Sequence, residues 1–335
     1  MTSRGVAIIG YGWAARMHAR ACLALKLPIA GVVGPNSEKR DAFAKEFGSS
    51  ESVEEIGALL QRLKPQLVVV ASPNSDHFSH ASESMRAGVS VLIEKPVTAN
   101  LADAVSLTRL AREHRVVAAV GHMWRYHDDV IALRERIALG EFGAIVRTHG
   151  FGVHAKWGPS GWFTEMRRSG GGALIDMGIH AIDTARYLLG DPLPSRVQAS
   201  IGVGVFRPGL EVDDDGLVII DWNNGARSLI EFGWWQPRLG GLEAETEVVG
   251  TSGSAQIWPE FRTFDKNYEH CSLEMYRRQL EDVVSCLDSG RSPQASIDVG
   301  VTALQIVCEA YEAARVTYQP TKHIKTWEPQ WRESN

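Results

Sequence analysis

The segment Val6-Ala7-Ile8-Ile9-Gly10-Tyr11-Gly12-Trp13-Ala14-Ala15, close to the start of the chain, indicates the fold of the first half. Its four leading apolar residues predict a buried strand, and a Gly-x-Gly-x-x-Ala pattern follows at once. Gly10 permits a tight turn, Gly12 lets the backbone approach a phosphate, and Ala15 allows close packing of a helix on the strand. A helix that begins here presents free N–H groups to an anion. The segment therefore predicts a dinucleotide-binding turn.

The same strand-then-helix pattern recurs over the first part of the chain. Strands are predicted at Val6–Ile9, Ile29–Val33, Leu67–Ala71, Val89–Ile93 and Val116–Val120, and helices at Ala14–Leu25, Ser37–Phe47, Ser75–Ala87 and Asn100–His114. Continuous apolar strands that alternate with helices indicate a parallel sheet covered on both faces. With right-handed crossovers, this predicts an α/β Rossmann domain, a doubly wound parallel sheet, over residues 1–123.

The pattern changes in residues 124–335, for which an α+β domain with a large, open, mostly antiparallel sheet is predicted. Its expected helices are Asp128–Leu139, Ala173–Leu189, Leu273–Leu287 and Ser296–Thr317, and its expected strands are Ala144–Val153, Ser195–Val205, Gly216–Trp222, Ala226–Trp234, Glu243–Val249 and Ala255–Trp258. Asn223-Asn224-Gly225 is typical of a hairpin turn.

Composition excludes several classes of function. The net charge of the 335 residues is −5 with both signs interspersed, which gives no footprint for DNA or RNA. No apolar stretch has the length of a membrane span, and the N-terminus lacks the pattern of a signal peptide. None of the four cysteines forms a C-x-x-C pair, which favours a reduced, cytoplasmic protein. The histidines lack metal-ligand spacing, and Asp213-Asp214-Asp215 lacks the partners of a calcium loop, so no metal is expected.

The residue at the end of the second predicted strand indicates which cofactor the chain binds. An NAD site would carry a carboxylate there for the ribose hydroxyls, but this chain has Gly34. Gly34 leaves room for a 2′-phosphate, and Ser37, Lys39 and Arg40 can bind it through charge-assisted hydrogen bonds. We predict NADP, with NAD as the alternative; Lys39 and Arg40 can instead be a solvated helix face.

Two further motifs lie at the carboxyl ends of strands and therefore point to the ligand crevice. Ser72-Pro73-Asn74-x-x-His77 follows the third long strand, and Glu94-Lys95-Pro96 follows the fourth. The predicted cofactor contacts are these residues together with Gly10, Gly12, Trp13, Ala14 and Ala15 of the turn. Pro96 indicates a rigid turn, in which the peptide bond before the proline can be cis. For Asn74 and His77, a plain turn at the start of a helix is the competing interpretation.

Together with Gly170-Gly171-Gly172-Ala173-Leu174-Ile175-Asp176-Met177-Gly178-Ile179-His180, these motifs resemble the glucose–fructose oxidoreductase, inositol dehydrogenase and MocA family. The resemblance covers nearly the whole chain. It implies an NAD(P)-dependent dehydrogenase or reductase of sugars, sugar derivatives or cyclitols. It also implies a homodimer or homotetramer formed through the C-terminal sheet, and a catalytic set of Lys95, Asp176 and His180.

The residues themselves are compatible with these roles. Asp176 and His180 are four apart, so on a helix the carboxylate can orient the imidazole. His180 has the intrinsic pKa for proton transfer near neutrality, and Lys95 can stabilise a developing alkoxide. The alternatives are an ordinary strand-end lysine and a core histidine with a structural aspartate. Asp183, on the same helix face, is expected to support the site or to bind a neighbouring backbone group.

The substrate is expected to contact Lys95, Asp176 and His180 as well as a second group of residues. That group comprises Arg125, just beyond the fifth strand, and His154, Lys156, Trp157 and Trp162, in the loop before the catalytic helix. Aromatic faces with scattered donors suit a polyhydroxylated ring, although tryptophans also serve subunit contacts. By strand alternation, at most one of Trp234 and Trp235 faces the site.

The leading functional hypothesis is hydride transfer between a nicotinamide cofactor and a secondary alcohol or ketone of a sugar or cyclitol. A second is a glycosidase that keeps NAD bound and recycles it, which would show no net change in cofactor absorbance. A third is a non-catalytic sensor that binds a dinucleotide and a partner protein, but a sensor has no need of a proton-transfer group.

Overall fold

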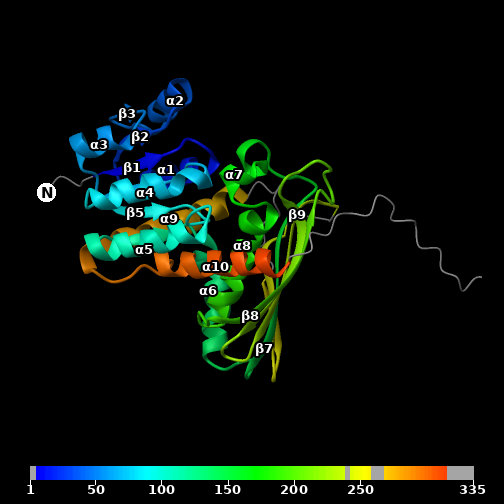
Figure 1. Ribbon diagram of the computed structural model, residues 1–335. Helices are drawn as coiled ribbons and strands as arrows, with labels where there is room; N and C mark the ends of the chain where they lie inside the picture. The colour runs from blue at the N-terminus through cyan, green and yellow to red at the C-terminus, as the bar shows by residue number, and fades with distance from the viewer. Residues whose placement is uncertain (1–4, 238–241, 258–267, 315–335) are drawn as a thin grey trace, which may run out of the picture.

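The computed structural model describes residues 5–237, 242–257 and 268–314 (Figure 1). The first half contains a six-stranded parallel sheet with the order β3-β2-β1-β4-β5-β6. The strands are β1 (Val6–Ile9), β2 (Ile29–Val33), β3 (Ser52–Val53), β4 (Leu67–Val70), β5 (Ser90–Ile93) and β6 (Ala118–Val120). From β1 the chain runs outward through β2 to β3, and from β4, beside β1, it runs outward the other way through β5 to β6. This reversal opens a crevice at the carboxyl ends of β1 and β4.

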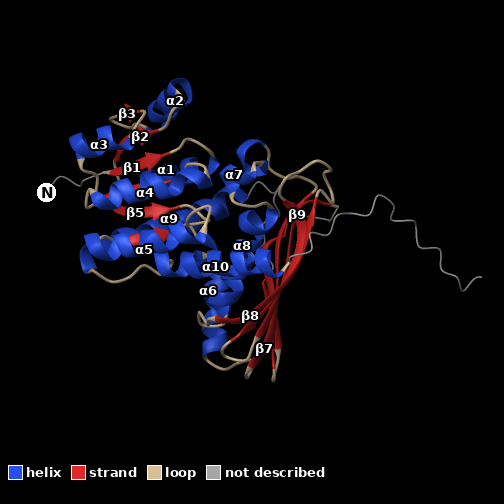
Figure 2. Cartoon of the chain, in the orientation of Figure 1, coloured by secondary structure: helices blue, strands red, loops and turns tan. Residues whose placement is uncertain are grey.

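Helices cover both faces of this sheet, as the sequence predicts (Figure 2). They are α1 (Trp13–Ala24), α2 (Ser37–Phe47), α3 (Ile56–Leu63), η1 (Asn74–Asp76) with α4 (His77–Arg86), and α5 (Leu101–His114). Alternate strand residues enter different cores: Ala7 and Ile9 pack in one buried cluster, and Val6 and Ile8 in another. This two-sided burial explains the unbroken apolar runs. The pair β3–α3 has no counterpart in the prediction, because a strand of two residues leaves no apolar run.

The second half contains a six-stranded sheet with the order β12-β11-β7-β10-β9-β8. The strands are β7 (Ile145–Ala155), β8 (Pro194–Val203), β9 (Asp213–Trp222), β10 (Arg227–Gln236), β11 (Leu242–Gly250) and β12 (Ser254–Ile257). Only β7 and β10 pair in parallel, so the sheet is mostly antiparallel as predicted. The expected hairpin turn at residues 223–225 joins β9 to β10.

Helices α6 (Asp128–Ala138) and α8 (Ile179–Leu188) cover one face of this second sheet (Figures 1 and 2). A π-helical turn, η4 (Leu174–Gly178), leads directly into α8. The turn lies so close to β7 that a Cβ atom on Gly152 would be 2.3 Å from the carbonyl oxygen of Met177. Glycine at position 152 therefore allows the segment of residues 174–178 to pack closely on the sheet.

The last two helices return to the first half of the molecule. α9 (Tyr268–Ser289) packs against α1, and its Met275 and Leu280 join the buried cluster of Val6 and Ile8. α10 (Ile297–Ala313) contacts α5, β6 and β8. A domain division at residue 124 stays a prediction. The last residue of the predicted strand Ala255–Trp258 and the last three residues of the predicted helix Ser296–Thr317 lie outside the described residues. No described helix has the length and apolar character that crossing a membrane requires.

Asp213, the first residue of β9, fixes the start of the segment that carries Asp176 and His180. Its buried carboxylate accepts hydrogen bonds from the backbone N–H of Gly172 (2.8 Å) and Leu174 (2.7 Å), and from the hydroxyl of Tyr311 (2.7 Å). It thus acts as an N-terminal cap supplied by a distant strand. A Cβ atom on Gly172 would be 1.9 Å from the carbonyl oxygen of Asp213, so only glycine fits there.

Replacing this carboxylate tests its role in holding the segment. In Asp213→Asn, one oxygen becomes an NH₂ group that faces a backbone donor, so we expect a loss of about 1–3 kcal/mol in the free energy of unfolding. Thermal unfolding of both proteins measures it. Asp221→Asn, near the other end of β9 and paired with Arg227 at the surface, is the control and should have a smaller effect. Equal unfolding temperatures for Asp213→Asn and wild type would contradict the role.

Candidate functional site

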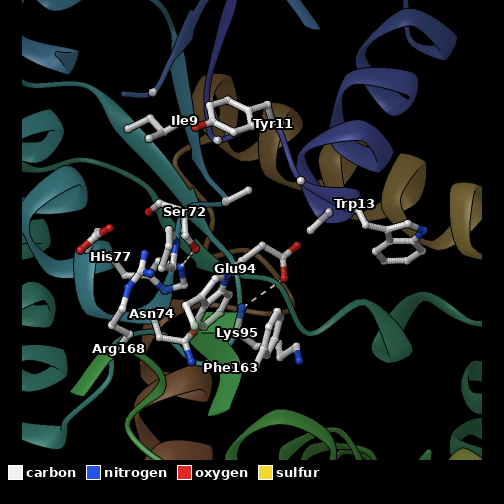
Figure 3. Close-up of a pocket in the computed structure, with 18 of the residues that line it drawn as sticks. Ile9, Tyr11, Trp13, Ser72, Asn74, His77, Glu94, Lys95, Phe163 and Arg168 are labelled. Carbon is white, nitrogen blue, oxygen red and sulfur yellow. Dashed lines mark hydrogen bonds between the residues drawn. The ribbon is translucent and has the colours of Figure 1, made fainter. Parts of the chain in front are cut away.

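A cavity of about 1090 Å³ opens at the carboxyl ends of β1, β2, β4 and β5 and is lined by both halves of the chain (Figure 3). The structure brings most of the predicted site residues into this one lining. They are Gly10, Gly12, Trp13, Ala14, Gly34, Lys39, Ser72, Pro73, Asn74, His77, Glu94, Lys95, Pro96, His154, Trp157, Trp162, Asp176 and His180. The predicted residues that do not line it are Ala15, Ser37, Arg40, Arg125 and Lys156.

The glycine turn has the geometry that a pyrophosphate requires. Gly10 has φ +105°, and a Cβ atom there would be 2.3 Å from the carbonyl oxygen of Ala71, so only glycine fits. Gly12 is the N-terminal cap residue of α1, and a Cβ atom there would meet nothing within 4 Å. No side chain caps α1 and its first turn holds no acidic residue. Its N–H groups and positive helix end can therefore bind a phosphate.

The end of the cavity beside β2 differs from the prediction in its details. The Arg40 guanidinium donates to the carbonyl oxygen of Gly34 (2.9 Å) and to the Ser52 hydroxyl (2.8 Å), so the protein already satisfies these donors. Lys39 lines the cavity. Two carboxylates that the sequence analysis did not select, Glu54 and Glu55, line it as well. The charge at this end is therefore mixed.

Asn74 and His77 connect the strand-end loops to each other and to the second half. The Asn74 amide donates to the carbonyl oxygen of Ser169 (2.8 Å) in α7 (Met166–Ser169). The fully buried His77 ring lies with Nδ1 2.9 Å from the carbonyl oxygen of Pro96 and Nε2 2.9 Å from that of Ser72. Burial lowers the pKa of His77. These side chains line the cavity and connect its walls, and their contact with a cofactor stays a prediction.

Glu94 and Lys95 lie side by side in the middle of the cavity wall (Figure 3). The Glu94 carboxylate is 2.8 Å from Nε2 of the buried His18. Burial alone would raise the pKa of Glu94, but the His18 contact and nearby positive charge hold it below its ordinary value. The Lys95–Pro96 peptide is cis, the isomer that the sequence analysis named as possible.

Lys95 reaches across the crevice to Asp176. Its ammonium group donates to the Asp176 carboxylate (2.9 Å) and to the Asp176 carbonyl oxygen (2.8 Å). The other carboxylate oxygen accepts from the indole N–H of Trp234 (3.0 Å). Burial acts to raise the pKa of Asp176, but Lys95 and these hydrogen bonds hold it below its usual value. Asp176 is therefore an ionised, fully engaged carboxylate at neutral pH.

The expected hydrogen bond from Asp176 to His180 is not what the structure contains. The Asp176 carboxylate binds Lys95 and Trp234, and Nδ1 of His180 is buried without a hydrogen-bond partner among the described residues. The physical reason is the π-helical turn over residues 174–178, which widens the helix between the two side chains. The i, i+4 pairing of a regular α-helix therefore does not apply.

His180 is a neutral imidazole at the cavity wall. It is 5% exposed, and burial, followed by the positive charge of Lys95 and the nearby imidazoles of His122 and His154, lowers its pKa well below the ordinary value. Because Nδ1 is buried, Nε2 is the ring nitrogen that a ligand in the cavity can reach. A neutral histidine beside a lysine is suited to accept a proton from a hydroxyl group.

The substrate candidates divide into two groups. His154 stacks on Trp157 with ring centroids 3.7 Å apart, and Trp162 stacks on Phe163 at 3.9 Å; all four line the cavity. Arg125 is 1% exposed, and its guanidinium binds Asp183 (2.8 Å) and Asp191 (2.6 Å).

Arg125 is therefore a buried structural cation, and Asp183 supports it. Lys156 is exposed and its side chain does not line the cavity. Of the two neighbouring tryptophans, Trp234 contacts Asp176, while Trp235 packs against Gly158.

Several lining residues were missed. Tyr11 occupies a variable position of the glycine pattern, and Glu54 and Glu55 belong to the unassigned segment around β3. Phe163 and Arg168 follow Trp162 in the loop that was already selected, so proximity in sequence was the available signal. Tyr276 comes from α9, and no local pattern could have placed it in this cavity.

Comparisons with known proteins agree with this geometry. The family model "Oxidoreductase family, NAD-binding Rossmann fold" matches residues 4–122, and "GFO/IDH/MocA C-terminal domain" matches residues 130–256. The chain is 28% identical to D-glucoside 3-dehydrogenase of Escherichia coli, over 92% of this chain and 95% of the relative. It is 26% identical to scyllo-inositol 2-dehydrogenase (NAD(+)) of Bacillus subtilis, over 89% and 92%.

A solved structure gives the same fold. GenD2 from gentamicin A biosynthesis, in complex with NAD, superposes with a TM-score of 0.84 at 27% identity and covers 94% of this chain and 95% of its own. Together the two family models span the glycine turn, Glu94-Lys95-Pro96 and the Asp176 to His180 segment. The chain is an NAD(P)-dependent oxidoreductase of the GFO/IDH/MocA family.

Proposed function

We propose that this enzyme transfers a hydride between a nicotinamide cofactor and a secondary alcohol or ketone of a sugar, sugar derivative or cyclitol. The observation that carries the proposal is the Lys95–Asp176 ion pair with a neutral His180 beside it, at the carboxyl end of a dinucleotide-binding sheet. The bound dinucleotide supplies the nicotinamide ring that accepts or donates the hydride. The residues around it supply binding, orientation and proton transfer.

The two catalytic roles follow from the hydrogen-bond inventory. The Lys95 ammonium has three hydrogens, and two of them point to Asp176. The third is free to bind the reacting oxygen and to stabilise the negative charge that develops there during oxidation. His180 accepts the hydroxyl proton at Nε2 and returns it in the reducing direction. Asp176 acts by fixing the position and the charge of Lys95.

The substrate class is supported by the cavity wall and by the relatives. The stacked rings of His154 with Trp157 and of Trp162 with Phe163 present apolar faces, and Lys95 and His180 supply polar atoms. Such a mixture suits the alternating C–H and hydroxyl groups of a polyhydroxylated ring. The relatives are named for activity on a glucoside and on an inositol, which are rings of this kind.

For the cofactor we propose a preference for NADP(H) that depends on Lys39. Gly34 leaves space for a 2′-phosphate, and Lys39 is the nearby cation that lines the cavity, since Arg40 is engaged by Gly34 and Ser52. Glu54 and Glu55 oppose a phosphate at this end, so its binding requires the charge of Lys39.

We also propose a cytoplasmic homo-oligomer that forms through the open face of the second sheet. Phe151, Leu217, Ile219 and Leu229 lie on strands β7, β9 and β10, are partly exposed, and belong to none of the buried clusters. A face of this kind is suited to pack against a second copy. Cys22, Cys286 and Cys308 are free thiols, which suits a reducing compartment.

Removing the imidazole tests the proton-transfer role. We expect His180→Asn to lower kcat by about 10²–10⁴-fold, because proton transfer loses its base, while the Kd for the cofactor changes little. Steady-state kinetics and a cofactor titration measure the two effects. In wild type, kcat/KM for oxidation should fall only at a pH below 6.5, the ordinary pKa of histidine, because the lowered pKa of His180 keeps its imidazole neutral. Unchanged turnover in a folded His180→Asn protein would exclude the role.

The Lys39→Ala variant tests the proposed preference for NADPH over NADH. Loss of a charged partner of the 2′-phosphate should raise the Kd for NADPH roughly tenfold and leave that for NADH nearly unchanged, as measured by fluorescence titration. Lys45→Ala, in the last turn of the same helix, is the control. Tighter binding of NADH than NADPH by wild type, or equal losses for both in Lys39→Ala, would contradict the NADP preference.

Sedimentation velocity tests the assembly. We expect wild type to sediment as a dimer or tetramer, and Leu229→Glu to shift it towards the monomer, because a buried, unpaired charge is costly at an interface. Val105→Glu, an exposed apolar residue on α5, serves as the control. A monomeric wild-type protein would rule out the proposed assembly.

A further inference from the structure

Two buried histidines have ring nitrogens that make no hydrogen bond within the described part of the chain. For His180, near the start of α8, this nitrogen is Nδ1. For His122, the residue before η2 (Met123–Tyr126), both ring nitrogens are in this state, and the residue is only 1% exposed. A buried polar atom without a partner is costly, and native proteins keep few of them. These nitrogens therefore point to a polar partner other than the described side chains.

His122 connects the wall that carries Glu94 to helix α8. It follows Gly121 after the end of β6, and a Cβ atom on Gly121 would be 2.8 Å from a carboxylate oxygen of Glu94. Nδ1 of His122 is 3.6 Å from a carboxylate oxygen of Asp183 in α8, just beyond hydrogen-bond distance. His122 does not line the main cavity. It therefore lies behind the cavity wall, where it can act on the substrate only through another residue.

His180, Asp183 and Thr184 share one face of α8. The helix is regular from Ile179 onward, after the π-helical turn, so residues three and four apart are neighbours on its surface. The contact with Asp183 therefore places the His122 ring within one helical turn of His180. The Thr184 hydroxyl is also buried and makes no hydrogen bond to a described residue. Three side chains with unsatisfied polar atoms thus belong to one small region behind the cavity wall.

The hydrogen-bond inventory gives the direction of each interaction. A neutral imidazole has one N–H donor and one acceptor nitrogen. In the proposed function, Nε2 of His180 accepts the substrate proton, so Nδ1 carries the hydrogen and requires an acceptor. For His122, the Asp183 carboxylate favours the hydrogen on Nδ1, which leaves Nε2 as an acceptor. Burial lowers the pKa of His122, in keeping with a neutral ring.

Asp183 is suited to anchor His122 because its own charge is held in place. Its two carboxylate oxygens accept hydrogen bonds from the Arg125 guanidinium, each at 2.8 Å, and both side chains are buried. Burial acts to raise the pKa of Asp183, but Arg125 holds it below the ordinary value. A carboxylate oxygen has more than one acceptor site, so the oxygen near His122 can also receive its N–H. Arg125 thereby contributes to the site without touching a ligand.

We propose that His122 is a positioning residue: through one bound water molecule, it holds His180 with the hydrogen on Nδ1 and with Nε2 facing the substrate. The inference rests on the proposed function. No direct hydrogen bond joins the two rings, and a buried water molecule typically has about three polar partners. Nδ1 of His180, Nε2 of His122 and the Thr184 hydroxyl supply three. Asp183, His122 and the water thus orient the base as a carboxylate does in a carboxylate–histidine pair.

The test compares His122→Phe with His122→Gln. Phenylalanine fills similar space but accepts no hydrogen bond, whereas glutamine keeps a donor for Asp183 and an acceptor for the water. Stopped-flow absorbance measures cofactor reduction in a single turnover, with the best substrate among glucose, methyl glucoside, myo-inositol and scyllo-inositol. We expect His122→Phe to lower this rate about 10–100-fold, with the Kd for substrate and for cofactor within about twofold, and His122→Gln to lie within about fivefold of wild type.

Thr184→Val tests the water without changing either ring, and it decides the inference if His122→Phe does not fold. The substitution removes the hydroxyl at nearly constant volume, so we expect the single-turnover rate to fall about 3–10-fold. Thr108→Val is the control, because Thr108 is a half-buried helical threonine far from the site, with its hydroxyl bonded to the carbonyl oxygen of Ala104 (3.3 Å). A wild-type rate in Thr184→Val overturns the water-mediated link.

Two results with the His122 variants also overturn the proposal. One is a wild-type rate in a folded His122→Phe protein. The other is an equal loss in His122→Phe and His122→Gln, which would show that the imidazole acts by packing alone. Recovery in His122→Gln supports the proposal, because a role in packing does not depend on a hydrogen-bond acceptor.

If no substrate in the panel changes cofactor absorbance, the proposed function fails by itself, and the position of the ring hydrogen decides the inference. Nuclear magnetic resonance of protein labelled with nitrogen-15 histidine measures it, and the His180→Asn spectrum identifies the His180 signals. We expect the hydrogen on Nδ1 in wild type and a mixture of both forms in His122→Phe. A hydrogen on Nε2 in wild type, or the same form in both proteins, overturns the proposal.

Discussion

The Lys95–Asp176 ion pair is the interaction on which the rest of the site depends, because it joins the two halves of the chain across the crevice. Both side chains are largely buried, so each charge requires the other: removing one partner of such a pair typically costs about 3–5 kcal/mol. The surrounding structure is arranged to hold the pair. Trp234 satisfies the second carboxylate oxygen, and Asp213 fixes the start of the segment that carries Asp176.

The same pair separates the ionisation states of the proposed catalytic groups. Its positive member lies near His180 and, together with burial, disfavours the imidazolium form. Its negative member is held ionised by Lys95. A lysine, an ionised carboxylate and a neutral imidazole therefore coexist within one cavity wall. This division supports the proposed roles, which are proton acceptance by His180 and charge stabilisation by Lys95.

The sequence was sufficient for five of the six strands of the first sheet and for the strand-end motifs, because continuous apolar strands and a glycine turn are local patterns. It placed Lys95, Asp176 and His180 in one cavity. It failed where tertiary contacts decide. Arg125 was predicted to bind the substrate, but its guanidinium pairs with Asp183 and Asp191 instead. The π-helical turn that separates Asp176 from His180 has no sequence signature that we used, and Tyr276 reaches the cavity from a helix far along the chain.

The position of α9 has a consequence for how the polypeptide is made. Its Met275, Leu280 and Val283 complete the apolar cluster on one face of the first sheet, and its Gln279 donates to the carbonyl oxygen of Val120 at the end of β6 (3.0 Å). During synthesis, the sheet is finished long before α9 leaves the ribosome. The helices α1 and α2 cover part of this face from the start, but the part that α9 covers stays exposed while residues 121–289 are made. The nucleotide-binding half is therefore complete only after α9 has been made, when nearly the whole chain has been synthesised.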